Sequence, residues 1–289
     1  MSTLLLLPTV LAATPLLVAG IGELLVERSG VLNLGLEGMM LTGCMTGFAV
    51  AATTGNPWLG LSAALAAGAA VAGLFALATV WARADQIVCG MALNLLAVGG
   101  SGAAWHVLQA HGLAELPASA GFSLPLALSW ASLALALLVW WMLRATRAGL
   151  ILRSLGEAPA ACAAAGIDVR WWRTGTLLVG GTCAGAAGAY LSLMRTHGFV
   201  PEMTGGAGFL VLALVIFGRW NIPGLLAGCL LFGLVEALQQ DLQARGLTTL
   251  VPWQLLKAAP YAVALIALTV VAKGRAGPAA LARAWPESY

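Results

Sequence analysis

The feature that most constrains this chain is a series of long apolar segments that are nearly free of charge. The first runs from Leu4 to Val26, and no Lys or Arg precedes Arg28. A helix of about 20 apolar residues crosses the roughly 30 Å hydrocarbon core of a bilayer, because it satisfies its backbone polar groups internally. The segments therefore predict membrane-spanning helices. Since a signal peptide would begin with basic residues, the first segment is expected to stay in the mature protein.

The composition agrees with a membrane protein, because only 9% of the 289 residues are charged, against about 25% in soluble domains. Breakers or charges separate the apolar segments, as at Gly55-Asn56-Pro57. Nine segments are expected to span the membrane, at residues 4–26, 34–54, 58–81, 87–108, 122–143, 174–194, 207–218, 222–240 and 252–272. Because 207–218 is short for a full crossing, counts of eight to ten remain open. The expected fold is an all-α helical bundle that forms a single integral membrane domain over residues 1–289.

Positive charges predict the orientation of this bundle. Cytoplasmic loops are enriched in Lys and Arg. With nine spans and the C-terminus inside, the inner side holds Arg28, Arg83, Arg144, Arg147, Arg153, Arg170, Arg173, Arg219, Lys273, Arg275 and Arg283. The outer side holds only Arg195, Arg245 and Lys257. The N-terminus is therefore expected outside and the C-terminus inside.

The longest polar insert, residues 144–173, contains a run that is typical of a short, smooth helix. Ser154 and Glu157 have the spacing of a capping box. Pro159 then precedes the alanine-rich stretch 160–165, and Gly166 follows it, which is the expected asymmetry of a helix start and end. A helix lying on a membrane would carry larger apolar residues. Small side chains instead suit close approach to a groove on another protein.

This run resembles the cytoplasmic coupling-helix signature of ABC importer permeases, in the branch that serves nucleosides and simple sugars. Three further segments resemble that family in the same order, at residues 27–41, 86–97 and 203–221. The resemblance implies a coupling helix over about 154–167 that sits in a cleft of an ATPase subunit. The residues implied to make this contact are Gly156, Glu157, Pro159, Ala161, Ala164 and Gly166.

The resemblance also implies the function and the partners. The chain would be a permease subunit that translocates nucleosides, or related simple sugars, across the inner membrane. It resembles the shorter of two permeases, which implies a heterodimer with a second permease, in contact with membrane lipid and supplied by an extracytoplasmic substrate-binding protein. ATP hydrolysis would fall to the partner, since the chain has no P-loop and only two lysines, Lys257 and Lys273.

Other classes of protein need features that the sequence largely lacks. A self-sufficient secondary transporter or channel would place charged groups mid-span, for which Glu236 is the main candidate. An intramembrane enzyme would need a nucleophile with its base, or metal ligands, on facing helices. No such set is found, and neither a metal nor another cofactor is expected. The five cysteines are expected to be free thiols. The scattered positive charges argue against nucleic-acid binding, which needs a basic patch.

Polar residues within the apolar segments are the candidates for the substrate pathway. Two interpretations are open for the cluster Glu23, Glu27, Arg28 and Glu37: an ion-paired cap at the inner interface, or a broken helix over 33–38 beside the pathway. In the fourth span, Gly90, Asn94, Ala97, Ser101 and Trp105 share one helix face, which either packs against a helix or lines the route. The pathway candidates are Asn33, Glu37, Asn94, Ser101 and Trp105. Glycines of the sixth span are expected to pack helices closely.

Overall fold

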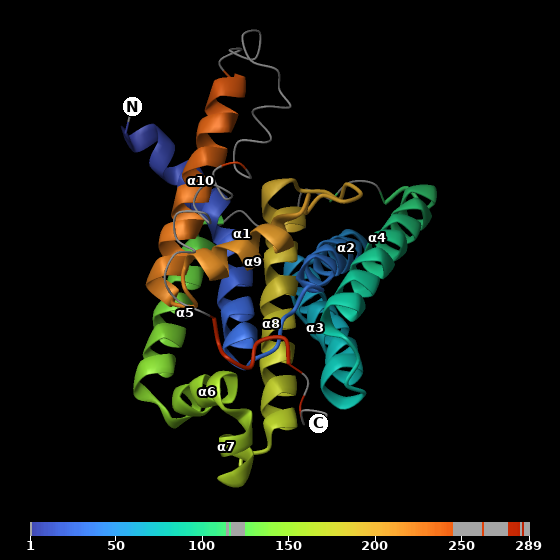
Figure 1. Cartoon of the computed structure of the whole chain (residues 1–289). Coiled ribbons are helices and arrows are strands. Elements are labelled where there is room, and N and C mark those ends of the chain that lie inside the picture. Colours follow the sequence, from blue (N-terminus) through green and yellow to red (C-terminus); the bar gives the residue numbers. More distant parts are fainter. Residues whose placement is uncertain are drawn as a thin grey trace.

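The computed structural model describes residues 2–113, 116, 125–244, 262, 277–283 and 285. Every regular element in these residues is helical (Figure 1). The elements are α1 (Ser2–Arg28), α2 (Leu36–Thr54), α3 (Pro57–Ala76), the π-helical η1 (Leu77–Trp81), α4 (Gln86–Ala110), α5 (Pro125–Ala145), α6 (Arg147–Glu157), α7 (Pro159–Ala164), α8 (Val169–Ala189), the π-helical η3 (Tyr190–Arg195), α9 (Ala207–Phe217) and α10 (Ile222–Ala244).

Six helical stretches in the described residues are long and apolar enough to cross a membrane. They are Leu5–Arg28, Pro57–Trp81, Gln86–Ala110, Ala127–Ala145, Val169–Arg195 and Ile222–Ala244. The 19-residue α2 occupies the predicted span 34–54. The 11 residues of α9 rise about 16 Å, roughly half of the hydrocarbon core. The predicted span 252–272 lies outside the described residues.

The sixth predicted span, 174–194, begins five residues too late. The helix starts at Val169, because the side chain of Asp168 accepts hydrogen bonds from the backbone N–H groups of Arg170 and Trp171. An aspartate at this position satisfies donors that the first helical turn leaves unpaired. Arg173, predicted to lie in the loop, is therefore a helical residue, and it is buried.

The helix α8 forms the centre of the bundle and packs against α1, α2 and α3. A Cβ atom at Gly185 would lie 2.1 Å from the carbonyl oxygen of Ala64, and one at Gly188 would lie 2.2 Å from that of Met40. Only glycine permits such contact between helix backbones, which confirms the packing role predicted for this span. The five cysteines are free, also as predicted.

Figure 1 places α6 and α7 at one end of the bundle and the N-terminus at the other. The described segment 277–283 returns to the α6 end, where the backbone N–H of Ala280 donates to the carbonyl of Gly156 at 2.8 Å. The short α9 lies across the middle of the molecule (Figure 1) and contacts α1, α2 and α10. The bundle therefore has two distinct ends joined by a core that contains a half-length helix.

Candidate coupling and translocation sites

The alanine-rich run forms the helix α7 at the extremity of the molecule (Figure 1). Pro159 and Cys162 are its buried residues. Cys162 packs with Leu155 of α6 and Val169 of α8 in a small apolar cluster, and burial raises the pKa of its thiol, so it behaves as a small apolar side chain. The alanines on the other faces of α7 are exposed, at Ala160, Ala161, Ala163 and Ala164. One side of α7 is thus attached to the bundle while the rest is accessible.

The predicted single helix over 154–167 is instead two helices, and the capping box is wrong. Ser154 lies inside α6, where its hydroxyl donates to the carbonyl of Leu150. Ala158 separates α6 from α7 and provides no side-chain cap. The break occurs there because the ring of Pro159 disfavours helical geometry in the preceding residue. Of the predicted coupling residues, Gly156 and Glu157 end α6, Pro159 to Ala164 form α7, and Gly166 follows it.

The end of α6 is fixed to the membrane-embedded part of the chain. A Cβ atom at Gly156 would lie 2.4 Å from the carbonyl oxygen of Arg28 and 3.1 Å from the Cβ of Pro278. Arg173 of α8 donates from Nε to the carbonyl of Ser29 at 3.1 Å and from Nη1 to that of Arg283 at 2.9 Å. These contacts join α6, α1, α8 and the segment 277–283. The region that carries α7 is therefore packed against two spans, α1 and α8.

The contacts by which Arg173 and the segment 277–283 join α8, α1 and α6 were not predicted from the sequence. The residues involved are far apart: 144 positions separate Arg173 from Ser29, and 110 separate it from Arg283. Apart from the turn signal of Gly277-Pro278, nothing in the local pattern of the C-terminal segment indicates that it packs against α6 and α8.

Asn33 and Asn94 hold the non-helical segment between α1 and α2. Asn33 is fully buried and donates from Nδ2 to Glu23 at 2.9 Å. Asn94 reaches in from α4: its Nδ2 donates to the carbonyl of Leu34, and its Oδ1 accepts from the N–H of Gly38, both at 2.8 Å. Irregular backbone at membrane depth is tolerated where it is buried in protein. These two pathway candidates therefore have a structural task that the sequence did not reveal.

Glu37 crosses from α2 to the start of α9. Its carboxylate accepts hydrogen bonds from the Thr204 hydroxyl at 2.6 Å and from the N–H groups of Gly206 and Gly208 at 2.8 and 2.6 Å. The first N–H groups of a helix lack partners within it, and the helix dipole favours a negative charge there. Glu37 thus supplies a cap for α9 from another helix.

The C-terminal end of α9 is held by Glu27 and Arg28, which belong to the same sequence motif as Glu37. The loop after α9 contains Arg219 and Trp220, both with positive φ. The indole N–H of Trp220 donates to the carboxylate of Glu27, and its carbonyl accepts from Nε and Nη2 of Arg28 at 2.8 and 2.6 Å. The motif at residues 27–41 therefore fixes both ends of α9, which belongs to the motif at 203–221.

These contacts decide between the two interpretations of the acidic cluster. In the described part of the chain, none of Glu23, Glu27, Arg28 and Glu37 forms an ion pair within 4.0 Å. The acids instead accept hydrogen bonds from neutral groups, and Arg28 donates to a carbonyl. The ion-paired cap is therefore wrong. A helix break is present, over residues 29–35 between α1 and α2 rather than over 33–38.

The buried face of α4 lies where the spacing predicted it. Gln86, Gly90, Asn94, Ala97 and Ser101 are the buried residues of this helix. Ser101 also lines a mainly apolar cavity of about 270 Å³ between α2, α3 and α4. The half-buried Trp105 packs against the rings of Phe48 and Phe199, each with a centroid distance of 5.6 Å. The face thus combines helix packing with a wall of this cavity, which Ala97 and Ser101 both line.

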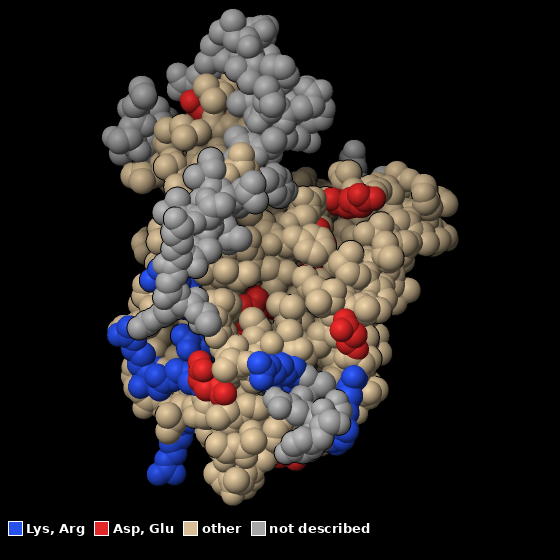
Figure 2. Space-filling view, in the orientation of Figure 1, with Lys and Arg blue, Asp and Glu red and all other residues tan. Residues whose placement is uncertain are grey.

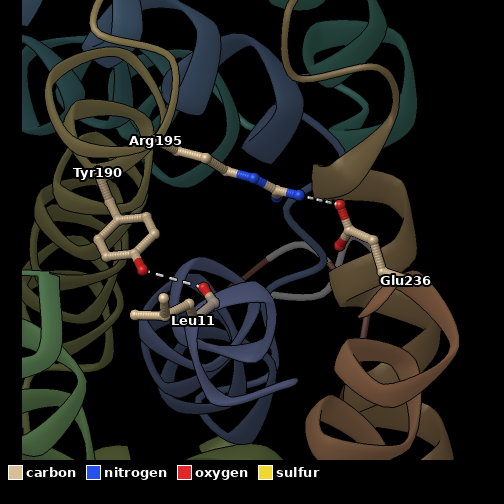
Figure 3. Close-up of polar contacts among 4 residues, drawn as sticks. All are labelled: Leu11, Tyr190, Arg195 and Glu236. Carbon is tan, nitrogen blue, oxygen red and sulfur yellow. Dashed lines mark hydrogen bonds and ion pairs between the residues drawn. The ribbon is translucent and has the colours of Figure 1, made fainter. Parts of the chain in front are cut away.

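A second cavity, of about 450 Å³, lies between α1, η3, α9 and α10 and has a more polar lining. Its polar residues include Arg195, Thr204, Glu236 and Gln239. Figure 3 shows Arg195 extending from η3 to form an ion pair with Glu236 of α10. In the same view, the hydroxyl of Tyr190 donates to the carbonyl of Leu11 at 3.0 Å. Glu236, the acid that a secondary transporter would use, is thus paired with a cation.

The described residues thus form an apolar helical bundle with a short exposed helix at one end, the architecture of a multi-pass membrane protein. Residues 5–272 match the family described as the permease component of the branched-chain amino acid transport system. The chain belongs to this family and is a permease subunit of an ATP-binding-cassette transporter, a multi-pass protein of the inner membrane.

Curated relatives cover most of the chain. A putative glucose ABC transporter permease protein of Haloferax volcanii is 40% identical over 255 residues, which is 83% of this chain and 78% of that protein. The guanosine ABC transporter permease protein of Bacillus subtilis is 33% identical over 285 residues, 90% of this chain and 89% of that protein. The nucleoside ABC transporter permease protein of Lactococcus lactis is also 33% identical, over 89% of each chain. No solved structure matches the chain significantly.

Proposed function

We propose that this permease forms half of an import pathway for nucleosides or related simple sugars, powered by a cytoplasmic ATPase that binds α7. The observation that carries the proposal is the exposed alanine surface of α7 at one end of the bundle. Small side chains let a groove of the partner approach the helix closely. Gly156, packed on the carbonyl of Arg28, offers a rigid route from that surface to α1. The named substrates of the relatives, guanosine, nucleosides and glucose, support the substrate class.

The polar cavity at Arg195 and Glu236 is the proposed pathway on the side opposite α7. Its walls include α9, whose two ends are held by Glu37 and by the loop at Trp220. A solute at this site would meet hydrogen-bonding groups from several helices. Asn33, Asn94, Ser101 and Trp105 would act on transport through the shape of the pathway walls, and Glu37 through the position of α9.

The proposed complex contains three other kinds of subunit. A second permease would complete the pathway as a heterodimer, and an extracytoplasmic binding protein would deliver the solute. ATP binding and hydrolysis by the ATPase would bias the permease between states open to either side. The chain itself holds no P-loop sequence.

Reconstitution of the permease into liposomes tests this proposal. With ATPase, binding protein and second permease present, ATP should drive uptake of labelled guanosine, and the permease alone should move none. Ribose, glucose and a branched-chain amino acid serve as comparison solutes. Uptake by the permease alone would establish a secondary transporter or channel and reject the proposal.

The proposed topology has nine spans, with the N-terminus outside and α7 inside. In support, Figure 1 places the N-terminus and α7 at opposite ends, and Figure 2 shows the visible Lys and Arg side chains toward the α7 end. We expect Ser288→Cys to resist an impermeant thiol reagent in intact cells and Ser2→Cys to react quickly, with the unsubstituted protein as background. Fast labelling at Ser288→Cys would contradict the proposed orientation.

A further inference from the structure

We propose that the cleft between α5 and α10 binds one anionic phospholipid from the leaflet on the α7 side. The cleft consists of two adjoining cavities that share Trp140 and Ile222. One is basic and the other almost wholly apolar. This pairing has the chemistry of a lipid with a charged head and apolar tails.

The basic cavity has a volume of about 530 Å³. Four arginines line it, from α1, α5, α6 and the loop after α9: Arg28, Arg144, Arg153 and Arg219. Among the described acids, Glu27 accepts a hydrogen bond from Trp220, a lining residue, and the charge of Glu157 acts on Arg28. Neither acid lines the cavity. The lining thus carries four positive charges, and the repulsion between Arg28 and Arg153 would be relieved by a bound phosphate.

The cavity lies at the depth expected for a phospholipid headgroup. Arg28 is the last residue of α1, Arg144 lies in the last turn of α5, and Ile222 is the first residue of α10. Three spans therefore end at this point, where the hydrocarbon core gives way to headgroups. Trp140 lies one turn before Arg144, whose guanidinium stacks on its ring at 4.6 Å, and aromatic residues favour this interface.

The apolar cavity continues from the basic one along α5 and α10. It has a volume of about 560 Å³. Apolar side chains line it, on α5 along one face between Trp130 and Trp140 and on α10 at Pro223 and Leu226. Ten residues of helix rise about 15 Å, which is one half of the roughly 30 Å hydrocarbon core. The groove therefore has the length of a single leaflet. A soluble anion would use only the basic part, whereas a phospholipid fills both, and basic pockets between spans recognise anionic headgroups.

The test measures binding of dioctanoyl phosphatidylglycerol to the purified full-length permease with its partners retained. Dioctanoyl phosphatidylcholine and inorganic phosphate are the comparison ligands. We expect Arg144→Gln/Arg153→Gln to weaken phosphatidylglycerol binding about thirtyfold, which is about 2 kcal/mol at tenfold per 1.4 kcal/mol. That loss corresponds to two arginines near an anionic lipid. Arg144 stacks on Trp140 and Arg153 donates to the carbonyl of Gly149, each within its own helix, so folding should persist.

Matched variants separate the headgroup from the acyl chains. Arg147→Gln/Arg170→Gln removes two arginines from the same end of the molecule that do not line the basic cavity, and should leave binding unchanged. Ala134→Trp should fill the apolar groove and weaken binding of phosphatidylglycerol, whereas Ala131→Trp, on an exposed residue of α5 outside its lining, should not. Equal affinity for the two lipids would overturn the proposal. So would full competition by phosphate together with an inert Ala134→Trp, which would leave only an anion site.

Discussion

Ala161→Glu and Ala164→Arg should each abolish recovery of the ATPase with the permease and abolish uptake. Both alanines are exposed on α7, and in the proposed complex they enter a groove of the ATPase. A charged side chain there would clash or lose its hydration without a partner. Burying an unpaired charge costs several kcal/mol, so the complex should weaken at least about 100-fold at tenfold per 1.4 kcal/mol. Co-purification, followed by uptake assays, measures the effect.

Two controls keep this result specific to α7. Ala161→Ser is small and uncharged, so it should retain the ATPase. Ala84→Glu puts the same charge on an exposed alanine of the turn before α4, on the same proposed side of the membrane, and should also retain it. Membrane abundance should be normal throughout, because α7 lies outside the spans. Full ATPase recovery with both charged variants would show that α7 is only a surface helix.

Local pattern predicted the parts of this fold that depend on neighbouring residues. Apolar runs located the six candidate membrane helices of the described residues to within five residues, since burial in lipid requires continuous apolar helix. The 4-3-4-4 spacing identified the buried face of α4, because helical periodicity is a local property. The local pattern gave a wrong prediction at Ser154, which was expected to cap the start of a helix. A Ser-x-x-Glu pattern also occurs within helices, where a serine hydroxyl bonds to the carbonyl four residues earlier.

The candidate site was predicted less completely, because its contacts join distant residues. Glu37 was named as a pathway residue, but its role as a cap depends on Gly208, which lies 171 positions away. Trp220 and Glu27 are 193 positions apart. No periodicity or spacing in one sequence specifies such pairs. The shared family resemblance of residues 27–41 and 203–221 identified both segments without showing that they touch.

Glu37→Ala should strongly destabilise the permease and remove uptake. The substitution leaves the buried N–H of Gly208 and the buried hydroxyl of Thr204 without their acceptor. Hydrogen bonds to charged groups contribute about 1.5–3 kcal/mol each, and the losses at one carboxylate do not add fully. We therefore expect a loss of roughly 3 kcal/mol or more in the free energy of unfolding. Thermal stability in detergent and membrane abundance measure it.

A double-mutant cycle with Thr204→Val connects this loss to the cap on α9. Thr204→Val alone should cost about 1.5–3 kcal/mol, as expected for one hydrogen bond to a charged group. Its hydroxyl bonds to Glu37, so the substitution should add little once Glu37→Ala is present. The hydroxyl of Thr42 bonds to the carbonyl of Gly38 in its own helix, so Thr42→Val should be nearly neutral in both backgrounds. If Thr204→Val costs the same with and without Glu37, the carboxylate does not stabilise α9 through this bond.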